Sequence, residues 1–458
     1  MKGNPEFTRN LWLEAKPSRL IAMVALLGAL FLLVGTRSGL GDTLSNTALM
    51  AYVAIIFIWG NRLAANSVIQ EVNNGTWDSQ RMSAISPWKM AIGKLYGGTV
   101  YVWFGGLICL GVYWLAQSKG GYSPRLMQTT VIYLGCGLLS HIISLIVSLV
   151  AIRKRRAYGR LRVWLYQFIG LAAAAPILFL GTSVVDRYKW GIDSLTEMSW
   201  YEMRFPQFGF TATAIAIFVV WGIVGACRMM RVELLSRNGP FLWLGFTVFT
   251  AIFVAGIHVP ARSAGMFRMF PLFENSLSYF MTIGSIVILL LAYVIALAEP
   301  KDKSVFTMLR RYAGERRLRN FFELLPRSAS TLALALVIIV ATGAWGFFDA
   351  DQIGAGKRNV RSTMIFLFAA RDIGFITLMS LWRPSPRADM TALVCLALSY
   401  SLVPALFFAS GIYALRPLFQ PVFSGDPYLN LALIGIETVT VYLILAFTIR
   451  SVVQPETA

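Results

Sequence analysis

The chain has 458 residues, of which 57% are hydrophobic and only 14% are charged, and its formal net charge at pH 7 is +19. Soluble domains carry about 25% charged residues. This composition therefore excludes a disordered chain, a coiled coil and an ordinary cytosolic enzyme. Long apolar runs recur along the whole sequence, and a helix of about 20 residues crosses a hydrocarbon core of about 30 Å. The sequence predicts a multi-pass membrane protein.

The apolar runs are continuous, whereas the strands of a membrane barrel alternate apolar and polar residues, so helices are expected. The predicted spans are residues 18–35, 47–60, 90–116, 126–152, 161–181, 208–227, 240–258, 275–298, 329–348, 362–381, 390–410 and 430–449. No signal-peptidase pattern follows the first run, which is therefore expected to be a retained span. The predicted fold is an all-α polytopic integral membrane protein with about 12 transmembrane helices. The spans divide into two sets of six, which predicts a first half at 1–232 and a second at 233–458.

The distribution of basic residues predicts the orientation. With the N-terminus inside, the inner segments hold 28 Lys and Arg residues and the outer segments hold 12. This bias follows the positive-inside rule and predicts that both termini are cytoplasmic. The basic residues lie in short loops beside spans, where anionic lipid headgroups attract them, so membrane lipids and no nucleic acid are the expected partners. The expected location is a cell membrane, the plasma or inner membrane of a bacterium.

The inner loop at 61–89 and the start of the third span carry the most specific pattern, at residues 71–94. The chain is expected to turn at Asn74-Gly75, to form a short helix capped by Thr76 or Asp78, and then to break before a further helix that enters the third span. The positions that define the pattern are Glu71, Gly75, Thr76, Asp78, Arg81, Ser86, Pro87, Gly93 and Lys94. A folded loop of this kind is more than a connector needs, which indicates that a cytoplasmic partner binds it. The alternative is a solvated turn followed by an ordinary capped helix.

This stretch resembles the loop of type-two ATP-binding-cassette (ABC) exporter permeases. Their pattern has a Glu, then Gly-Thr, an acidic residue, a Ser/Pro turn, and a Gly-Lys pair that opens the third helix. The N-terminus also resembles the family, because Asn4-Pro5, Arg9 and Glu14 match its Asn-Pro-led amphipathic helix at the inner membrane surface. The resemblance covers about residues 4–230. It further implies an outer helical segment between spans five and six, at 193–203.

The resemblance implies a function and a partner. The loop at 61–89 would carry the coupling helix, with Glu71, Gly75, Thr76, Asp78 and Arg81 as docking and shape residues. The chain has no Walker A pattern, so ATP would be bound and hydrolysed by a separate cytoplasmic ABC ATPase subunit. The chain itself would be the exporter's permease, with no catalytic residue, no cofactor and no enzymatic activity of its own. A homodimer of the chain is left open, and no residue selects a substrate.

The second long inner loop, at 299–327, has a different pattern. Phe306, Leu309 and Tyr312 lie at helical spacing, and the same holds for the apolar residues from Leu318 onward, with arginines between them. This arrangement predicts one or two amphipathic helices in the headgroup layer. A second docking site for an ATPase is the alternative, but the loop lacks the Gly-Thr to Gly-Lys pattern, so a lipid-facing anchor is favoured.

Ionisable residues inside spans need partners, because each costs about 2.5–3.5 kcal/mol at a helix centre on insertion scales. Arg371 and Asp372 lie mid-way along the tenth span, and Glu437 lies mid-way along the twelfth. We expect Arg371 to contact Glu437 directly or through one polar residue, with Asp372 turned toward a different helix or a water-filled cavity. A structural ion pair is favoured over a translocation path. His141, in the fourth span, is expected to be a hydrogen-bonded packing residue.

Two other classes of protein remain as alternatives. A membrane-embedded acyl- or glycosyl-transferase could use the acidic outer segment, whose carboxylates are Asp186, Asp193, Glu197 and Glu202. A non-transporting membrane scaffold is the second alternative. The sequence has two histidines and four cysteines that are never paired in a CxxC motif, so no metal site is expected.

The predicted orientation can be tested with reporters. A reporter fused after Ala458 is expected to read as cytoplasmic, and the same reporter fused after Gly120, in a predicted outer segment, is expected to read as external. Paired phosphatase and fluorescent-protein fusions measure this directly. An external signal from the fusion at Ala458 contradicts the predicted placement of both termini.

Overall fold

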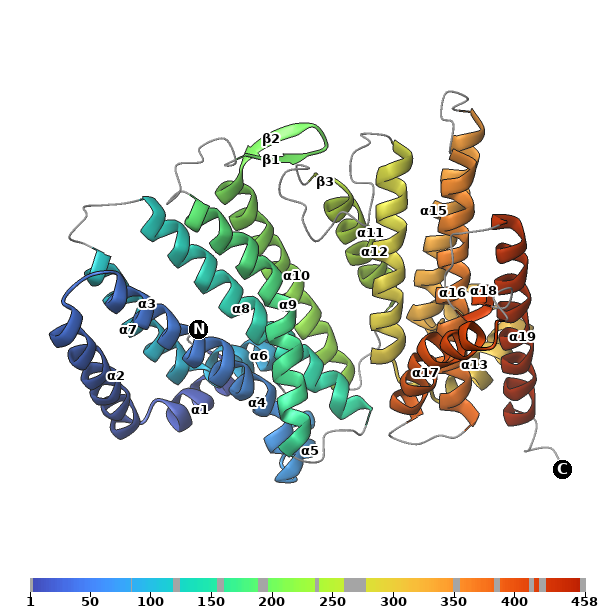
Figure 1. Ribbon diagram of the computed structural model, residues 1–458. Helices are drawn as coiled ribbons and strands as arrows, with labels where there is room; N and C mark the ends of the chain where they lie inside the picture. The colour runs from blue at the N-terminus through green and yellow to red at the C-terminus, as the bar shows by residue number, and fades with distance from the viewer. Residues whose placement is uncertain are drawn as a thin grey trace. The chain divides into compact units, whose positions relative to one another are not determined.

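The computed structural model describes residues 3–83, 85–117, 124–154, 160–187, 197–234, 239–258, 277–348, 355–382, 388–411, 416–419 and 426–453. Most of these residues are helical (Figure 1). They form two compact units. One contains Met1–Met198 and Arg204–Asn238, and the other contains Ser199–Met203 and Gly239–Ala458. The two units are described separately below.

The first unit is built from ten α-helices and two π-helical segments within the described residues. They are α1 (Pro5–Glu14), α2 (Pro17–Ser38), α3 (Asp42–Tyr52), η1 (Val53–Gly60), α4 (Asn61–Asn73), α5 (Trp77–Arg81), α6 (Pro87–Ile92), η2 (Gly93–Gly97), α7 (Val100–Gln117), α8 (Pro124–Arg153), α9 (Arg160–Arg187) and α10 (Gln207–Glu233). Helices α8, α9 and α10 pack side by side (Figure 1). Because η1 joins α3 to α4 without a break, residues 42–73 form one long helical run.

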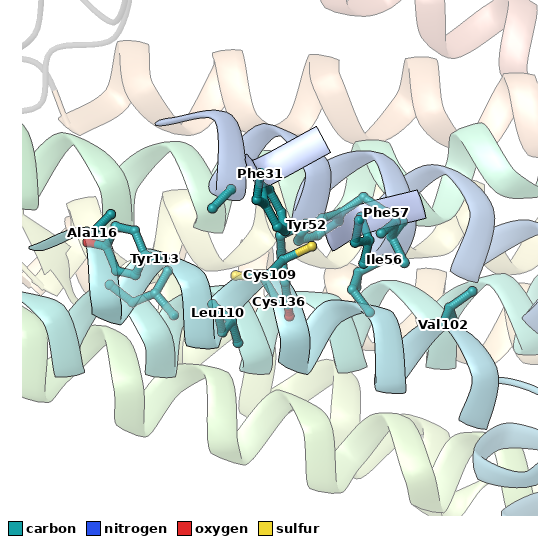
Figure 2. Close-up of a cluster of buried hydrophobic side chains, with 14 of the residues drawn as sticks. Phe31, Tyr52, Ile56, Phe57, Val102, Cys109, Leu110, Tyr113, Ala116 and Cys136 are labelled. Atoms are coloured by element: carbon teal, nitrogen blue, oxygen red, sulfur yellow. The ribbon is translucent and has the colours of Figure 1, made fainter. Parts of the chain in front are cut away.

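The core of the first unit is apolar and joins α2, α3, η1, α7 and α8. Figure 2 shows Tyr52, Ile56 and Phe57 close to Cys109 and Cys136 in this cluster. The Tyr52 hydroxyl donates a hydrogen bond to the Tyr133 carbonyl oxygen at 3.1 Å. All four cysteines of the chain are free, and Cys109 and Cys136 serve as small buried apolar residues.

The second unit contains the remaining described helices. They are α11 (Phe241–Ala255), α12 (Leu277–Ala298), α13 (Lys303–Gly314), α14 (Leu318–Leu324), α15 (Arg327–Phe348), α16 (Ala355–Trp382), α17 (Ala388–Ala409), α18 (Arg416–Phe419) and α19 (Pro427–Val453). Helix α12 packs against α11, α15 and α16, while α16 also packs against α17 and α19. Buried small residues, including Ala251, Ala292 and Ala335, let these helices approach closely.

Ten helical runs among the described residues are long and apolar enough to cross a membrane, so the chain is a multi-pass helical membrane protein by length and composition. They overlap ten of the predicted spans. The second run extends to Asn73, so part of the predicted inner loop at 61–89 is helical, and the third run begins at Val100 rather than at residue 90. The fifth and seventh predicted spans coincide with α9 and α11, whose described apolar stretches, Val163–Ala175 and Phe241–Ala255, are shorter. The number twelve and the cytoplasmic placement of the termini remain predictions.

The expected outer helix at 193–203 is wrong over its described residues, 197–203. Strand β1 (Glu197–Trp200) is followed by a turn at Tyr201 and Glu202, which have φ angles of 46° and 70°, and then by β2 (Met203–Pro206). Strand β1 pairs antiparallel with β3 (Ile257–His258).

Aromatic side chains explain why this segment is extended. The Trp200 indole N–H donates to the Phe253 carbonyl at 3.0 Å, and the Tyr201 hydroxyl donates to the Ile252 carbonyl at 2.8 Å. Both acceptors lie in the last turn of α11, where carbonyl groups lack partners further along the helix. Docking on α11 therefore favours a strand and a tight turn in place of a helix.

The loop at 299–327 forms two helices, α13 and α14, which agrees with the predicted one or two amphipathic helices. Arg310 and Arg319 are exposed, and so are the apolar side chains of Met308, Leu318 and Phe322. The combination of exposed basic and exposed apolar residues suits a membrane surface. The headgroup layer as the location of these helices remains a prediction.

Candidate functional site

The loop singled out in the sequence begins with a tight helix end. The Gly75 N–H donates to the Val72 carbonyl at 3.2 Å, and the Thr76 N–H donates to the Glu71 carbonyl at 3.0 Å. This is the Schellman arrangement, which places one residue in the left-handed region. Gly75 is that residue, with φ of +70°, and glycine adopts this conformation without steric cost. The predicted turn at Asn74-Gly75 is confirmed.

Helix α5 follows directly, with Thr76 at its N-cap position. The Thr76 hydroxyl donates to the Glu71 carbonyl at 3.3 Å, so it reinforces the turn. At the other end of α5, Arg81 Nε donates to the Glu233 carbonyl of α10 at 2.9 Å, and its Nη1 donates to Asp78 at 3.2 Å. Arg81 therefore ties α5 to α10.

The predicted break before the third span is also present. Ser86 caps α6, because its hydroxyl oxygen accepts the Lys89 N–H at 3.4 Å, and Pro87 is the first residue of the helix. The backbone continues through η2 toward α7. The Gly93-Lys94 pair thus lies on a helical segment whose start is set by Ser86 and Pro87.

The N-terminal helix α1 packs directly on this segment. A Cβ atom on Gly93 would lie 2.8 Å from the Glu6 Cβ and from the Phe7 backbone nitrogen, and one on Gly97 would lie 2.7 Å from the Asn10 Cβ. The side-chain amide of Asn4 donates to the Lys89 carbonyl at 2.7 Å. The glycines allow close approach, and the amide fixes where α1 begins.

Four charged side chains and one amide meet where α1 crosses η2, and we call them the Lys94 cluster: Glu6, Arg9, Glu71, Gln80 and Lys94. The Lys94 ammonium, whose side chain has 0% exposure, lies 3.1 Å from Glu6 Oε1, 3.0 Å from Glu71 Oε2 and 3.0 Å from Gln80 Oε1. Arg9 Nη1 donates to Glu71 Oε1 at 3.0 Å. The cluster joins α1, α4, α5 and η2 through one buried ammonium group.

The charges of the Lys94 cluster balance, because two basic groups face two carboxylates. Burial alone lowers the pKa of Arg9, but the hydrogen bond and negative charge of Glu71 outweigh it and raise that pKa above its ordinary value. Arg9 therefore keeps its charge over the whole physiological range. Sequence reasoning named Arg9, Glu71 and Lys94, but it missed Glu6 and Gln80 as members of one ionic cluster.

A second group of polar side chains lies inside the second unit, and we call it the Arg371 cluster: Tyr293, Arg371, Asp372, Tyr400 and Glu437. Arg371 Nη1 donates to Glu437 Oε2 at 2.9 Å, which confirms the predicted contact between the tenth and twelfth spans. Arg371 Nη1 also donates to the Leu418 carbonyl of α18 at 3.0 Å. The guanidinium group thus joins α16, α18 and α19.

Asp372 turns toward other helices, as expected, and also contacts its neighbour Arg371. Its Oδ2 accepts hydrogen bonds from Tyr293 of α12 at 2.6 Å and from Tyr400 of α17 at 2.8 Å, so it does reach other helices. However, its Oδ1 accepts from Arg371 Nε at 2.9 Å. The expected turn of Asp372 toward a different helix is therefore confirmed, and the bond between the two neighbouring residues is an additional contact that the sequence did not indicate. The tyrosines were missed, although a Tyr within a span signals a hydroxyl that needs a partner.

The other predicted positions add no further site. His141 is buried, and its Nε2 lies 2.8 Å from the Ile56 carbonyl oxygen, as expected of a hydrogen-bonded packing residue. Asp193 and the side chains of Asp186 and Glu197 lie outside the described residues, and Glu202 is exposed in a turn. The described part of the chain contains no group of three or more His, Cys, Asp or Glu side chains able to hold a metal ion.

The docking of α1 predicts a position-specific effect in the third span. Gly93→Ala is expected to destabilise the protein by about 1–3 kcal/mol, because overpacking has this cost and the backbone of α1 must shift. The control is Gly111→Ala in α7, where a Cβ atom would meet nothing within 4 Å. Unfolding in a denaturant series measures both variants, and equal effects would contradict the close approach of α1.

The Arg371–Glu437 contact predicts non-additive stability effects. Removing Arg371 is expected to cost about 3–5 kcal/mol, because the buried Asp372 carboxylate loses its counter-charge. Removing Glu437 is expected to cost less, because Arg371 keeps its contact with Asp372. The double change Arg371→Ala, Glu437→Ala is expected to be milder than the sum of the two single changes. A double-mutant cycle on unfolding free energies measures the coupling, and a coupling energy of zero would show that the contact does not contribute.

No family model, curated protein or solved structure matches this chain. Functional inference therefore rests on the geometry of the two clusters and on the sequence pattern of the loop. Of the two, the Lys94 cluster contains Glu71 and Lys94 of that pattern, and it is the candidate functional site.

Proposed function

We propose that the chain is the membrane permease subunit of an ABC exporter, which moves a substrate across the membrane using ATP hydrolysed by a separate cytoplasmic ATPase. The observation that carries this proposal is the Lys94 cluster. It bonds the loop that resembles the family's coupling segment to α1 and α4, and Arg81 bonds the same loop to α10. A flexible connector has no need of such bonds.

Force transmission is the physical argument for a coupling role. Helix α5 is held at Gln80 by the buried Lys94 ammonium, and at Arg81 by the end of α10. A partner that pushes on α5 therefore displaces helices that continue into apolar spans, because the close-packed interior transmits strain. The Schellman turn at Gly75 fixes the direction of α5 relative to α4, so a displacement of α5 is passed on to α4.

The outer face of α5 and the residues after it are available for a partner. Asp78 and Met82 are among the most exposed residues of the unit, with 83% exposure for the Asp78 side chain and 83% for Met82. Trp88, at the start of α6, is 53% exposed. Exposed apolar residues beside a charged one are typical of a protein-binding surface.

The rival functions make different demands. A membrane-embedded transferase needs a reactive group with its base or a pair of acids at one membrane face, and a scaffold needs no coupling of its loop to the spans. The Lys94 cluster bonds the loop to helices of the membrane bundle, which is what a coupling segment needs and a passive scaffold does not. Co-purification of an ATPase with the chain separates the exporter from both rivals.

The docking role of α5 predicts a specific loss of coupling. Asp78→Ala is expected to weaken ATPase co-purification by about tenfold, equivalent to about 1.4 kcal/mol, and to uncouple ATP hydrolysis from export while the fold is kept. The matched control is Glu323→Ala, which also removes an exposed carboxylate that pairs with an arginine on its own helix. Quantitative pull-down and vesicle transport assays measure both effects. Full export by the Asp78 variant, or equal losses in both variants, would refute the assignment of docking to α5.

A further inference from the structure

The Arg371 cluster carries an excess of negative charge. It has one guanidinium group, Arg371, and two carboxyl groups, Asp372 and Glu437, and its side chains lie within apolar helices. The other buried ionic contacts described above are balanced, since the Lys94 cluster has two charges of each sign. An uncompensated charge in a membrane interior is costly. The Arg371 cluster therefore needs one more positive charge.

Asp372 is the carboxyl group that is held as an anion. Its two oxygens accept hydrogen bonds from three donors, which are Arg371 at 2.9 Å, Tyr293 at 2.6 Å and Tyr400 at 2.8 Å. An ionised carboxylate only accepts hydrogen bonds, and donors on both oxygens stabilise that form. The Asp372 side chain is only 4% exposed, so it is also shielded from water. The positive charge of Arg371 is matched by this anion.

Glu437 is placed differently. Its Oε2 accepts one hydrogen bond, from Arg371 Nη1 at 2.9 Å, and this Nη1 atom also donates to the Leu418 carbonyl. The Glu437 side chain retains 24% exposure, against 4% for Asp372. Glu437 is thus the carboxyl group with the weaker support for its charge and with the less enclosed side chain.

We propose that Glu437 is a proton-binding site inside the second unit, and that one proton on its carboxyl group neutralises the Arg371 cluster. A proton taken up from the bulk solution binds to a carboxylate oxygen of Glu437, and the protonated group still accepts the Arg371 hydrogen bond through its carbonyl oxygen. A metal cation fits less well, because it needs several oxygen ligands and both oxygens of Asp372 already accept hydrogen bonds.

Among the described residues, the charged and titratable groups nearest Glu437 belong to α16 and α17. Helix α16 contributes Arg371 and Asp372, and α17 contributes Tyr400. Helix α18 reaches the cluster through the Leu418 carbonyl, which accepts from Arg371, and the side chain of Arg416 in α18 lies outside the described residues. Helix α13 packs on a more distant part of α19, where Phe306 contacts the cluster that contains Leu445. Arg371 is the cation that opposes proton uptake, and its pairing with Asp372 weakens that opposition.

Release of the proton would change the packing around α19. The cluster would then carry a net negative charge, and Arg371 would be shared between two anions on α16 and α19. The hydroxyls of Thr438 and Tyr442 also link α19 to α16, by donating to the Leu367 and Ala370 carbonyls at 3.2 Å each. The site is therefore placed to couple a protonation event to the contact between these two helices. This inference does not depend on the proposed ABC function.

Infrared titration of the full chain in phosphatidylcholine vesicles tests the proposal. The carbonyl stretch of a protonated carboxylic acid is resolved from that of a carboxylate, and side-chain isotope labelling distinguishes Glu from Asp. At neutral pH we expect a protonated glutamate band that is lost in Glu437→Gln. The band should persist in Glu233→Gln, which changes another buried glutamate, and in Glu323→Gln, which changes an exposed one.

Glu437→Asp is the second variant, and it tests the same site if Glu437→Gln does not fold. Glu437→Asp retains a carboxyl group, so the protonated band should move from the labelled glutamate to the labelled aspartate. Replacing potassium by sodium in the buffer should leave the band unchanged. The proposal is overturned by the absence of a protonated glutamate band at neutral pH, by a band that survives Glu437→Gln, or by a band that sodium removes.

Discussion

The buried ammonium group of Lys94 is the interaction on which the first unit depends. An ammonium group with no exposed surface is stable only if anions and acceptors surround it, and here Glu6 and Glu71 supply the anions. Because Glu6 belongs to α1 and Glu71 to α4, the requirement to neutralise one charge brings the N-terminal helix, the second span and the start of the third span together. The glycines of η2 then set how closely α1 can approach.

The same physical requirement is met differently in the second unit. The guanidinium group of Arg371 donates hydrogen bonds to both Asp372 and Glu437. Tyrosines of α12 and α17 donate two further hydrogen bonds to Asp372. The Leu418 carbonyl of α18 also accepts from Arg371, so five helices contact this polar cluster within an otherwise apolar bundle. The balanced Lys94 cluster suits a rigid joint, whereas the unbalanced Arg371 cluster suits a site that gains and loses a charge.

The π-helical segment η1 shows how polar side chains also repair the backbone in the first unit. A π-segment shifts the hydrogen-bond ladder and leaves carbonyl groups to be satisfied from outside. The ring of His141 lies 2.8 Å from the Ile56 carbonyl oxygen, and the Gln167 side chain donates to the Ile58 carbonyl at 2.7 Å. Helices α8 and α9 are thereby bonded to the irregular part of the second span, which gives His141 a structural role.

Much of the architecture follows from local sequence. Apolar runs, the Ser86-Pro87 start signal and the Asn74-Gly75 turn determined where helices begin and end, because capping and backbone freedom are properties of adjacent residues. The charge imbalance among Arg371, Asp372 and Glu437 could also be read directly from the spans. Tertiary structure alone decided that Glu6 and Gln80 join Lys94, that Tyr293 and Tyr400 bind Asp372, and that residues 197–203 form a strand and a turn. Each of these depends on contacts between segments far apart in the chain, and a periodic pattern along one segment carries no information about which distant side chain will supply the partner.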